Sequence, residues 1–181
     1  MRVLSLLFFL LAVPALAQGP ELVTEVRADL DDDGVQETYT LREDGDLVVS
    51  EAGWERVVPD AAFVGPVAGQ QPSLGISEGD SVLLTSMNEG LGRDRWSMTL
   101  TIAHRQGDWR IAGYTYDFYD LMDPEAWGHC DLNLLTGEGI AETDESLLAP
   151  VATSAPLLWD WRASELPLPM GNICFDGWVV P

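Results

Sequence analysis

Lysine is absent from this sequence, and all nine of its basic residues are arginines, against 30 aspartates and glutamates. The formal net charge is therefore −21. A surface this negative repels nucleic-acid phosphates and anionic lipid headgroups, which excludes both as expected partners. It favours a cationic protein, a cationic peptide or a metal ion, although the same charge also serves simply to keep an exported chain in solution.

Histidine is scarce, because His104 and His129 are the only two in the chain. Two histidines are too few for a histidine-rich zinc site. The sequence also lacks a Gly-x-Ser-x-Gly motif, an HExxH motif and a phosphate-binding glycine loop. Its many acids include Glu89, Asp117 and Asp120, but no pair of carboxylates stands out as a catalytic couple. The sequence thus gives little support for catalysis.

The one long apolar run lies near the start, from Val3 to Val13, and is followed by Pro14 and the small-residue ending Ala15-Leu16-Ala17. This pattern is typical of a secretory signal peptide, and the run is too short to span a bilayer. We expect cleavage near Ala17, which removes Arg2 and lowers the net charge to −22. No cysteine follows the run, so we expect no membrane anchor and a periplasmic or extracellular location.

Cysteine is limited to Cys130 and Cys174. Export places both in an oxidising compartment, so we expect one disulfide that tethers a C-terminal segment rich in proline and tryptophan. A catalytic pair of Cys130 with its neighbour His129 is the alternative, but sequence neighbours rarely adopt the geometry that activates a thiolate.

The chain after the leader, residues 18–181, is expected to form a single domain that is mainly β. No stretch keeps a helical period over about three turns. Residues 18–122 read as an antiparallel meander of hairpins, which would form a sandwich-like or strongly curved sheet. Residues 123–181 hold several prolines and read as an irregular C-terminal part. Within it, residues 132–142 read as a strand, a glycine turn at Gly137 to Gly139 and a further short strand.

Glycine next to aspartate marks the expected hairpin turns, at Gly45, Gly79 and Gly107. The residues 96–102 alternate between apolar and small polar side chains, as in a half-buried strand. In the return strand, Trp109 and Ile111 have one parity and Tyr114 the other. Either both faces of that strand are covered, or a bulge near Gly113 shifts the register.

The most distinctive stretch is Asp29 to Glu37, DLDDDGVQE, which fits the pattern D-x-D-x-D-G-x-x-E. Carboxylates at every second residue suit Ca²⁺, which takes about six to eight oxygen ligands, and the glycine permits a sharp turn. An EF-hand also requires a glutamate at the twelfth position, where this chain has Thr40, and helical flanks, where this chain has strand-like sequence. An EF-hand is therefore excluded.

The loop resembles the calcium loops of FG-GAP and integrin-type repeats, in which the same pattern joins two strands. Single loops of this form also resemble those of exported bacterial proteins of unassigned function. The resemblance implies a structural calcium ion, with Gly34 as the hinge of the loop and Asp32 pointing outward. The ligands it implies are Asp29, Asp31, Asp33, the Val35 carbonyl and Glu37. The chain has one copy of the loop, whereas FG-GAP propellers have several, so the propeller fold is not expected here. The ninth position of the loop holds glutamate, where aspartate is commoner.

These observations lead to the hypothesis of an exported, calcium-stabilised β-domain that acts as a binding module. Its acidic surface would engage a basic protein, as an inhibitor or immunity factor does. Two alternatives stay open: a secreted glycan hydrolase with paired carboxylates about 5 to 9 Å apart, and a structural protein of the envelope.

Overall fold

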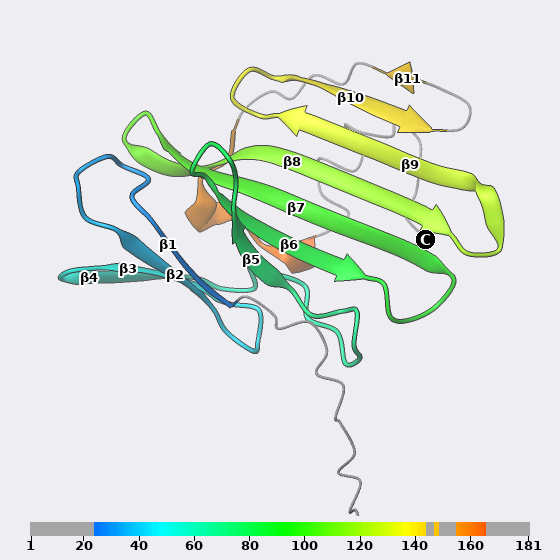
Figure 1. Ribbon diagram of the computed structural model, residues 1–181, viewed down its shortest axis with the longest axis horizontal. Helices are drawn as coiled ribbons and strands as arrows, with labels where there is room; N and C mark the ends of the chain where they lie inside the picture. Colours follow the sequence, from blue (N-terminus) through cyan, green and yellow to red (C-terminus); the bar gives the residue numbers. More distant parts are fainter. Residues whose placement is uncertain (1–23, 144–146, 149–154, 166–181) are drawn as a thin grey trace, which may run out of the picture.

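The structure is a computed structural model, and it describes residues 24–143, 147–148 and 155–165. Within these ranges the chain is mainly β, which confirms the expected fold class. The strands form two antiparallel sheets, a four-stranded sheet in the order β1-β2-β3-β4 and a seven-stranded sheet in the order β11-β10-β9-β8-β7-β6-β5 (Figure 1). Within each sheet every strand pairs with its neighbour in sequence, whereas β4 and β5 belong to different sheets. The predicted meander of hairpins is therefore confirmed within each sheet.

The smaller sheet holds β1 (Glu25–Ala28), β2 (Glu37–Leu41), β3 (Leu47–Glu51) and β4 (Trp54–Val58). The larger sheet holds β5 (Ser73–Ile76), β6 (Val82–Asn88), β7 (Asp94–Arg105), β8 (Asp108–Asp120), β9 (Asp123–Asn133), β10 (Glu138–Thr143) and β11 (Leu147–Leu148). Two short 3₁₀ helices follow, η1 (Leu158–Asp160) and η2 (Ala163–Glu165).

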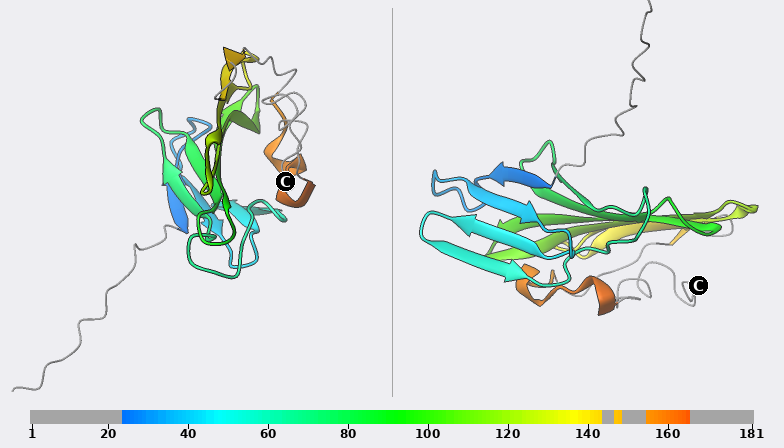
Figure 2. Two further views of the ribbon diagram at one scale, coloured as in Figure 1. Left: turned by 90° about the vertical axis from the view of Figure 1, so that its right-hand side faces the viewer. Right: turned by 90° about the horizontal axis from the view of Figure 1, so that it is seen from below.

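The smaller sheet lies against one end of the larger sheet, and η1 and η2 lie beside both (Figure 2). The two sheets share one cluster of buried side chains. Alternate residues of the central strands supply it, such as Tyr39 and Val49 from the smaller sheet and Leu100 and Ile111 from the larger. The alternation of apolar and polar residues along the strands therefore determines which side chains face the core.

The three predicted glycine turns all lie between paired strands. Gly45 joins β2 to β3, Gly79 joins β5 to β6, and Gly107 joins β7 to β8. Gly45 cannot be replaced freely, because it has φ of +91° and a Cβ atom there would lie 2.4 Å from the Ala62 carbonyl oxygen. This turn therefore needs glycine both for its backbone conformation and for its close contact.

A bulge resolves the parity change in β8. Thr101 pairs with Gly113 and Ile102 pairs with Ile111, so Ala112 is the extra residue of the longer strand. The shift brings Tyr114 opposite Leu100, on the face that also carries Ile111. The bulge interpretation is confirmed, and its effect is to keep one continuous apolar face along the hairpin.

The expectation of an irregular segment from residue 123 is wrong for residues 123–131, whereas the strand, turn and short strand expected over residues 132–142 are confirmed. Asp123–Asn133 and Glu138–Thr143 form the strands β9 and β10 of the larger sheet. Pro124 is compatible with β9 because the register shifts there: Asp120 pairs with Asp123 and Tyr119 with Trp127, which leaves the proline outside the ladder.

Several expectations fall outside the described residues, namely the signal peptide over residues 1–17 and Cys174. Cys130 itself is fully buried in β9 and is not a free thiol. Its pairing with Cys174 stays a prediction. No helix within the described ranges is long and apolar enough to cross a bilayer.

Candidate metal site

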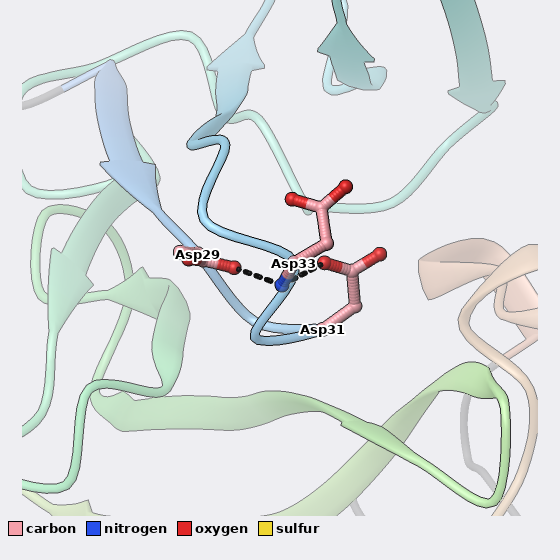
Figure 3. A group of neighbouring side chains, drawn as sticks. All are labelled: Asp29, Asp31 and Asp33. Atoms are coloured by element: carbon pink, nitrogen blue, oxygen red, sulfur yellow. Dashed lines mark hydrogen bonds between the residues drawn. The ribbon is translucent and has the colours of Figure 1, made fainter.

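The acidic stretch forms the loop between β1 and β2, and its aspartates fold it back on itself. The two carboxylate oxygens of Asp29 accept hydrogen bonds from the backbone of Asp33 at 3.1 Å and of Gly34 at 2.9 Å. The amide of Asp33 also donates to Asp31 Oδ1 at 3.2 Å. This amide therefore lies between the carboxylates of Asp29 and Asp31 (Figure 3).

The curl of the loop depends on two residues with left-handed backbone. Asp32 has φ of 61° and Gly34 has φ of 90°. Between them, Asp33 Oδ1 accepts a 2.7 Å hydrogen bond from the amide of Val35. The result is that Asp29, Asp31 and Asp33 each offer a carboxylate oxygen within 4.8 Å of the others. Asp32 is exposed and lies outside this group.

Glu37, the first residue of β2, lies beneath the loop and is fully buried. Its Oε2 accepts a 2.9 Å hydrogen bond from the backbone of Leu30, which fastens the loop to the strand. Its Oε1 has no hydrogen-bond partner among the described residues. Burial raises the pKa of Glu37, and the nearby charges of Asp31 and Asp29 add to that rise while the hydrogen bond from Leu30 opposes it.

A second group of carboxylates contains a residue that the loop pattern does not predict. Oxygens of Asp31, Glu37 and Glu51 lie within 4.8 Å of one another, and Glu51 is the last residue of β3. The register of the hairpin could have revealed it. Thr38 pairs with Ser50, so the next positions along the two strands bring Glu37 and Glu51 to face each other.

The arrangement offers oxygen donors only. Carboxylates and carbonyl groups suit hard cations such as Ca²⁺, whereas zinc prefers nitrogen and sulfur donors. A buried carboxylate oxygen without a partner loses its hydration and gains nothing in exchange. A cation placed among these groups would supply the missing interaction and offset the mutual repulsion of the acids. The residues present therefore fit a calcium ion.

The structure places the predicted side-chain ligands in two groups that share Asp31. Asp29, Asp31 and Asp33 come together as a cluster, and Glu37 joins Asp31 in the second group. Val35 is exposed, with its amide held by Asp33, and Gly34 has the backbone that a hinge requires.

The Cys–His alternative does not match the structure. Neighbouring residues of a strand face opposite sides, and while Cys130 is buried, His129 is partly exposed. Nδ1 of His129 lies 2.6 Å from Asp117 Oδ1 on β8. The other histidine, His104, packs against Trp109 with 4.7 Å between ring centroids and the rings tilted by 53°. Each histidine thus has a structural neighbour of its own.

The remaining acids singled out from the sequence are engaged separately. Glu89 accepts a 2.6 Å hydrogen bond from the Tyr119 hydroxyl, and Asp120 accepts one from Arg93 Nε at 2.7 Å. An open hollow on the larger sheet is lined by small, polar and aliphatic residues, among them Thr101, Arg105 and Asp131, and no aromatic residue lines it. This hollow lacks the aromatic walls expected of a glycan site.

Comparisons of the chain with protein-family models, with curated proteins and with solved structures find no match.

Proposed function

We propose that this chain is an exported β-domain that binds one calcium ion through its acidic loop and serves as a non-catalytic binding module. The ion would be held by Asp29, Asp31, Asp33, the Val35 carbonyl and Glu37, with Gly34 as the hinge of the loop. Its role would be structural, because it would fasten the loop to the first strands of the smaller sheet.

The observation that carries the calcium proposal is the buried Glu37 carboxylate at the base of the loop. Its Oε1 has no partner among the described residues, yet it lies beside Asp31, in a loop with three clustered aspartates. No described arginine forms an ion pair with Asp29, Asp31, Asp33 or Glu37. A cation is therefore the remaining source of positive charge for this group.

The acidic surface supports a cationic protein or peptide as the partner. Several arginines already serve the domain itself: Arg93 pairs with Asp120, Arg110 donates to the Ala155 carbonyl, and Arg56 stacks on Trp159. The chain has only nine arginines against 30 acidic residues, so most of the acidic side chains have no basic residue to neutralise them. Such a surface attracts basic partners at rates and affinities that fall with salt, as an inhibitor or immunity factor would require.

Thermal melting of the full chain with calcium and with a chelator tests the metal. We expect calcium to raise the melting temperature, since a ligand that binds only the folded state stabilises it by mass action. Magnesium at equal concentration is the control for general screening of charge, and it should have a smaller effect because it favours a stricter octahedral site. Equal melting temperatures in calcium and in chelator would refute the proposal.

Capture of partners from periplasmic extract, at low and at raised salt, tests the binding role. A basic protein retained at low salt and released by salt is the expected result. A retained partner that salt does not release would contradict the electrostatic mechanism. The signal peptide and the Cys130–Cys174 disulfide remain parts of this proposal.

A further inference from the structure

Glu51 lies in the smaller sheet on the same side as the buried Glu37, one strand away from the acidic loop. It ends β3, and it belongs to the carboxylate group that includes Asp31 of the loop and Glu37 of β2. Three separate parts of the chain thus place carboxylate oxygens within 4.8 Å of one another. None of the described arginines pairs with any of the three.

Glu37 supplies an independent sign that something positive belongs there. The side chain is fully buried, and Oε1 makes no hydrogen bond to a described residue, whereas Oε2 is used by the Leu30 amide. The oxygen without a partner therefore belongs to a buried carboxylate that is grouped with those of Asp31 and Glu51. A buried acceptor of this kind is costly unless it is satisfied.

The position of Glu37 and Glu51 in the sheet adds a second reason. The pairing of Thr38 with Ser50 places the two glutamates at the next opposing positions of β2 and β3. Like charges directly opposite each other on neighbouring strands destabilise a sheet. A divalent cation between them would turn this repulsion into attraction.

The orientation of Glu51 is held from the following strand. Trp54 is paired with Glu51 across the tight β3–β4 turn, and its indole nitrogen donates a 3.1 Å hydrogen bond to Glu51 Oε2. Trp54 in turn packs edge-on against Trp109 of β8, at 5.4 Å between ring centroids. The carboxylate of Glu51 is thereby positioned by the aromatic contact between the two sheets.

We propose that Glu51 is a further ligand of the calcium ion, supplied from β3 and lying outside the D-x-D-x-D-G-x-x-E loop. This inference rests on the proposed calcium site and extends it. The ion would then connect the loop, β2 and β3. Through Glu51 and its hydrogen bond from Trp54, it would also be linked to the aromatic contact between the two sheets. Calcium binding would in this way stabilise the packing of the sheets as well as the loop.

The test compares the full chain with its Glu51→Gln and Glu55→Gln variants, by calorimetric titration with calcium and by melting in chelator. Glu55 is the matched control, because it is exposed on β4 and pairs with Ser50, so it faces away from Glu51. Both changes remove one negative charge of the same sheet. Glutamine at position 51 retains an oxygen that can accept from Trp54.

We expect Glu51→Gln to weaken calcium binding by about tenfold or more, since the charge of the ligands sets calcium affinity. In chelator the same variant should melt at a higher temperature than the wild type, because the repulsion with Glu37 is removed. Glu55→Gln should bind calcium as the wild type does. A merely structural role for Glu51 would instead lower the melting temperature in chelator and leave the affinity unchanged.

The outcomes separate the two proposals. If the wild type binds calcium and Glu51→Gln binds it equally well, Glu51 is not a ligand, and the loop site stands without it. If the wild type binds no calcium, the proposed function fails and this inference fails with it. If Glu51→Gln does not fold, the Trp54→Phe variant provides the second measurement. It frees the orientation of Glu51, so the calcium affinity should fall, and an unchanged affinity would overturn the proposal.

Discussion

The indole nitrogen of Trp109 donates a 2.8 Å hydrogen bond to the hydroxyl of Tyr39, and this contact joins β8 of the larger sheet to β2 of the smaller one. Tyr39 is fully buried and lies two residues after Glu37, on the same face of β2. The junction of the sheets and the base of the acidic loop are therefore built on one strand.

Replacing this hydroxyl should loosen the junction. We expect Tyr39→Phe to lower the free energy of unfolding by about 1 to 3 kcal/mol, because it leaves a partly buried indole donor unsatisfied. Chemical denaturation with urea measures the change. Tyr119→Phe is the control, since that hydroxyl bonds Glu89 at an exposed position, and it should cost less. Equal losses in the two variants would contradict this account.

The loop conformation depends on Gly34. We expect Gly34→Ala to destabilise the protein by about 1 to 2 kcal/mol, the cost of a left-handed backbone for a residue with a side chain. No atom lies within 4 Å of the added Cβ, so the cost comes from backbone conformation and not from a steric clash. Gly79→Ala is the matched control, because that turn glycine has no positive φ and its nearest contact is an ordinary 3.9 Å. Urea denaturation of both variants distinguishes the two effects.

The core of the larger sheet should respond strongly to loss of volume. Leu100 in β7 is fully buried, and we expect Leu100→Ala to cost about 2 to 5 kcal/mol through lost burial and the cavity that remains. Leu91→Ala removes the same atoms from a side chain that is 55% exposed, and it should change stability by less than about 0.5 kcal/mol. Thermal and urea denaturation check both values. A small effect at Leu100 would show that the shared core is not packed as described.

The tyrosines should make the fold sensitive to alkali. Burial raises the pKa of Tyr116 to about 12, and burial also raises the pKa of Tyr39 and Tyr114 above the ordinary value. The pKa of exposed Tyr119 is raised chiefly by its hydrogen bond to Glu89. Above pH of about 10 the unfolded chain releases tyrosine protons that the folded chain retains, so stability should fall as the pH rises further.

Ultraviolet absorbance of phenolate, followed with circular dichroism, tests this expectation. The phenolate absorbance should increase only at pH values well above 10, and part of this increase should occur at the same pH as the loss of secondary structure. A simple titration near pH 10 in a fully folded protein would show that these hydroxyls are accessible to water.

The sequence by itself determined the mainly β class, the hairpin turns at Gly45, Gly79 and Gly107, and the alternation that buries Leu100 and Ile102. These features depend on local backbone preferences and on the period of a strand, which neighbouring residues specify. The cluster of Asp29, Asp31 and Asp33 is likewise specified by neighbouring residues, because a single loop brings these carboxylates together.

The tertiary structure alone decided which residues from distant parts of the chain meet. Pro124 was compatible with a long strand because a register shift left it unpaired, and Glu51 reached the acidic loop because β3 pairs with β2 in one register. Pairing between strands depends on the packing of both sheets on their common core, since a shift of one residue would turn every side chain to the other face. The loop could therefore be recognised from nine residues, whereas the carboxylate that faces it from β3 required the folded sheet.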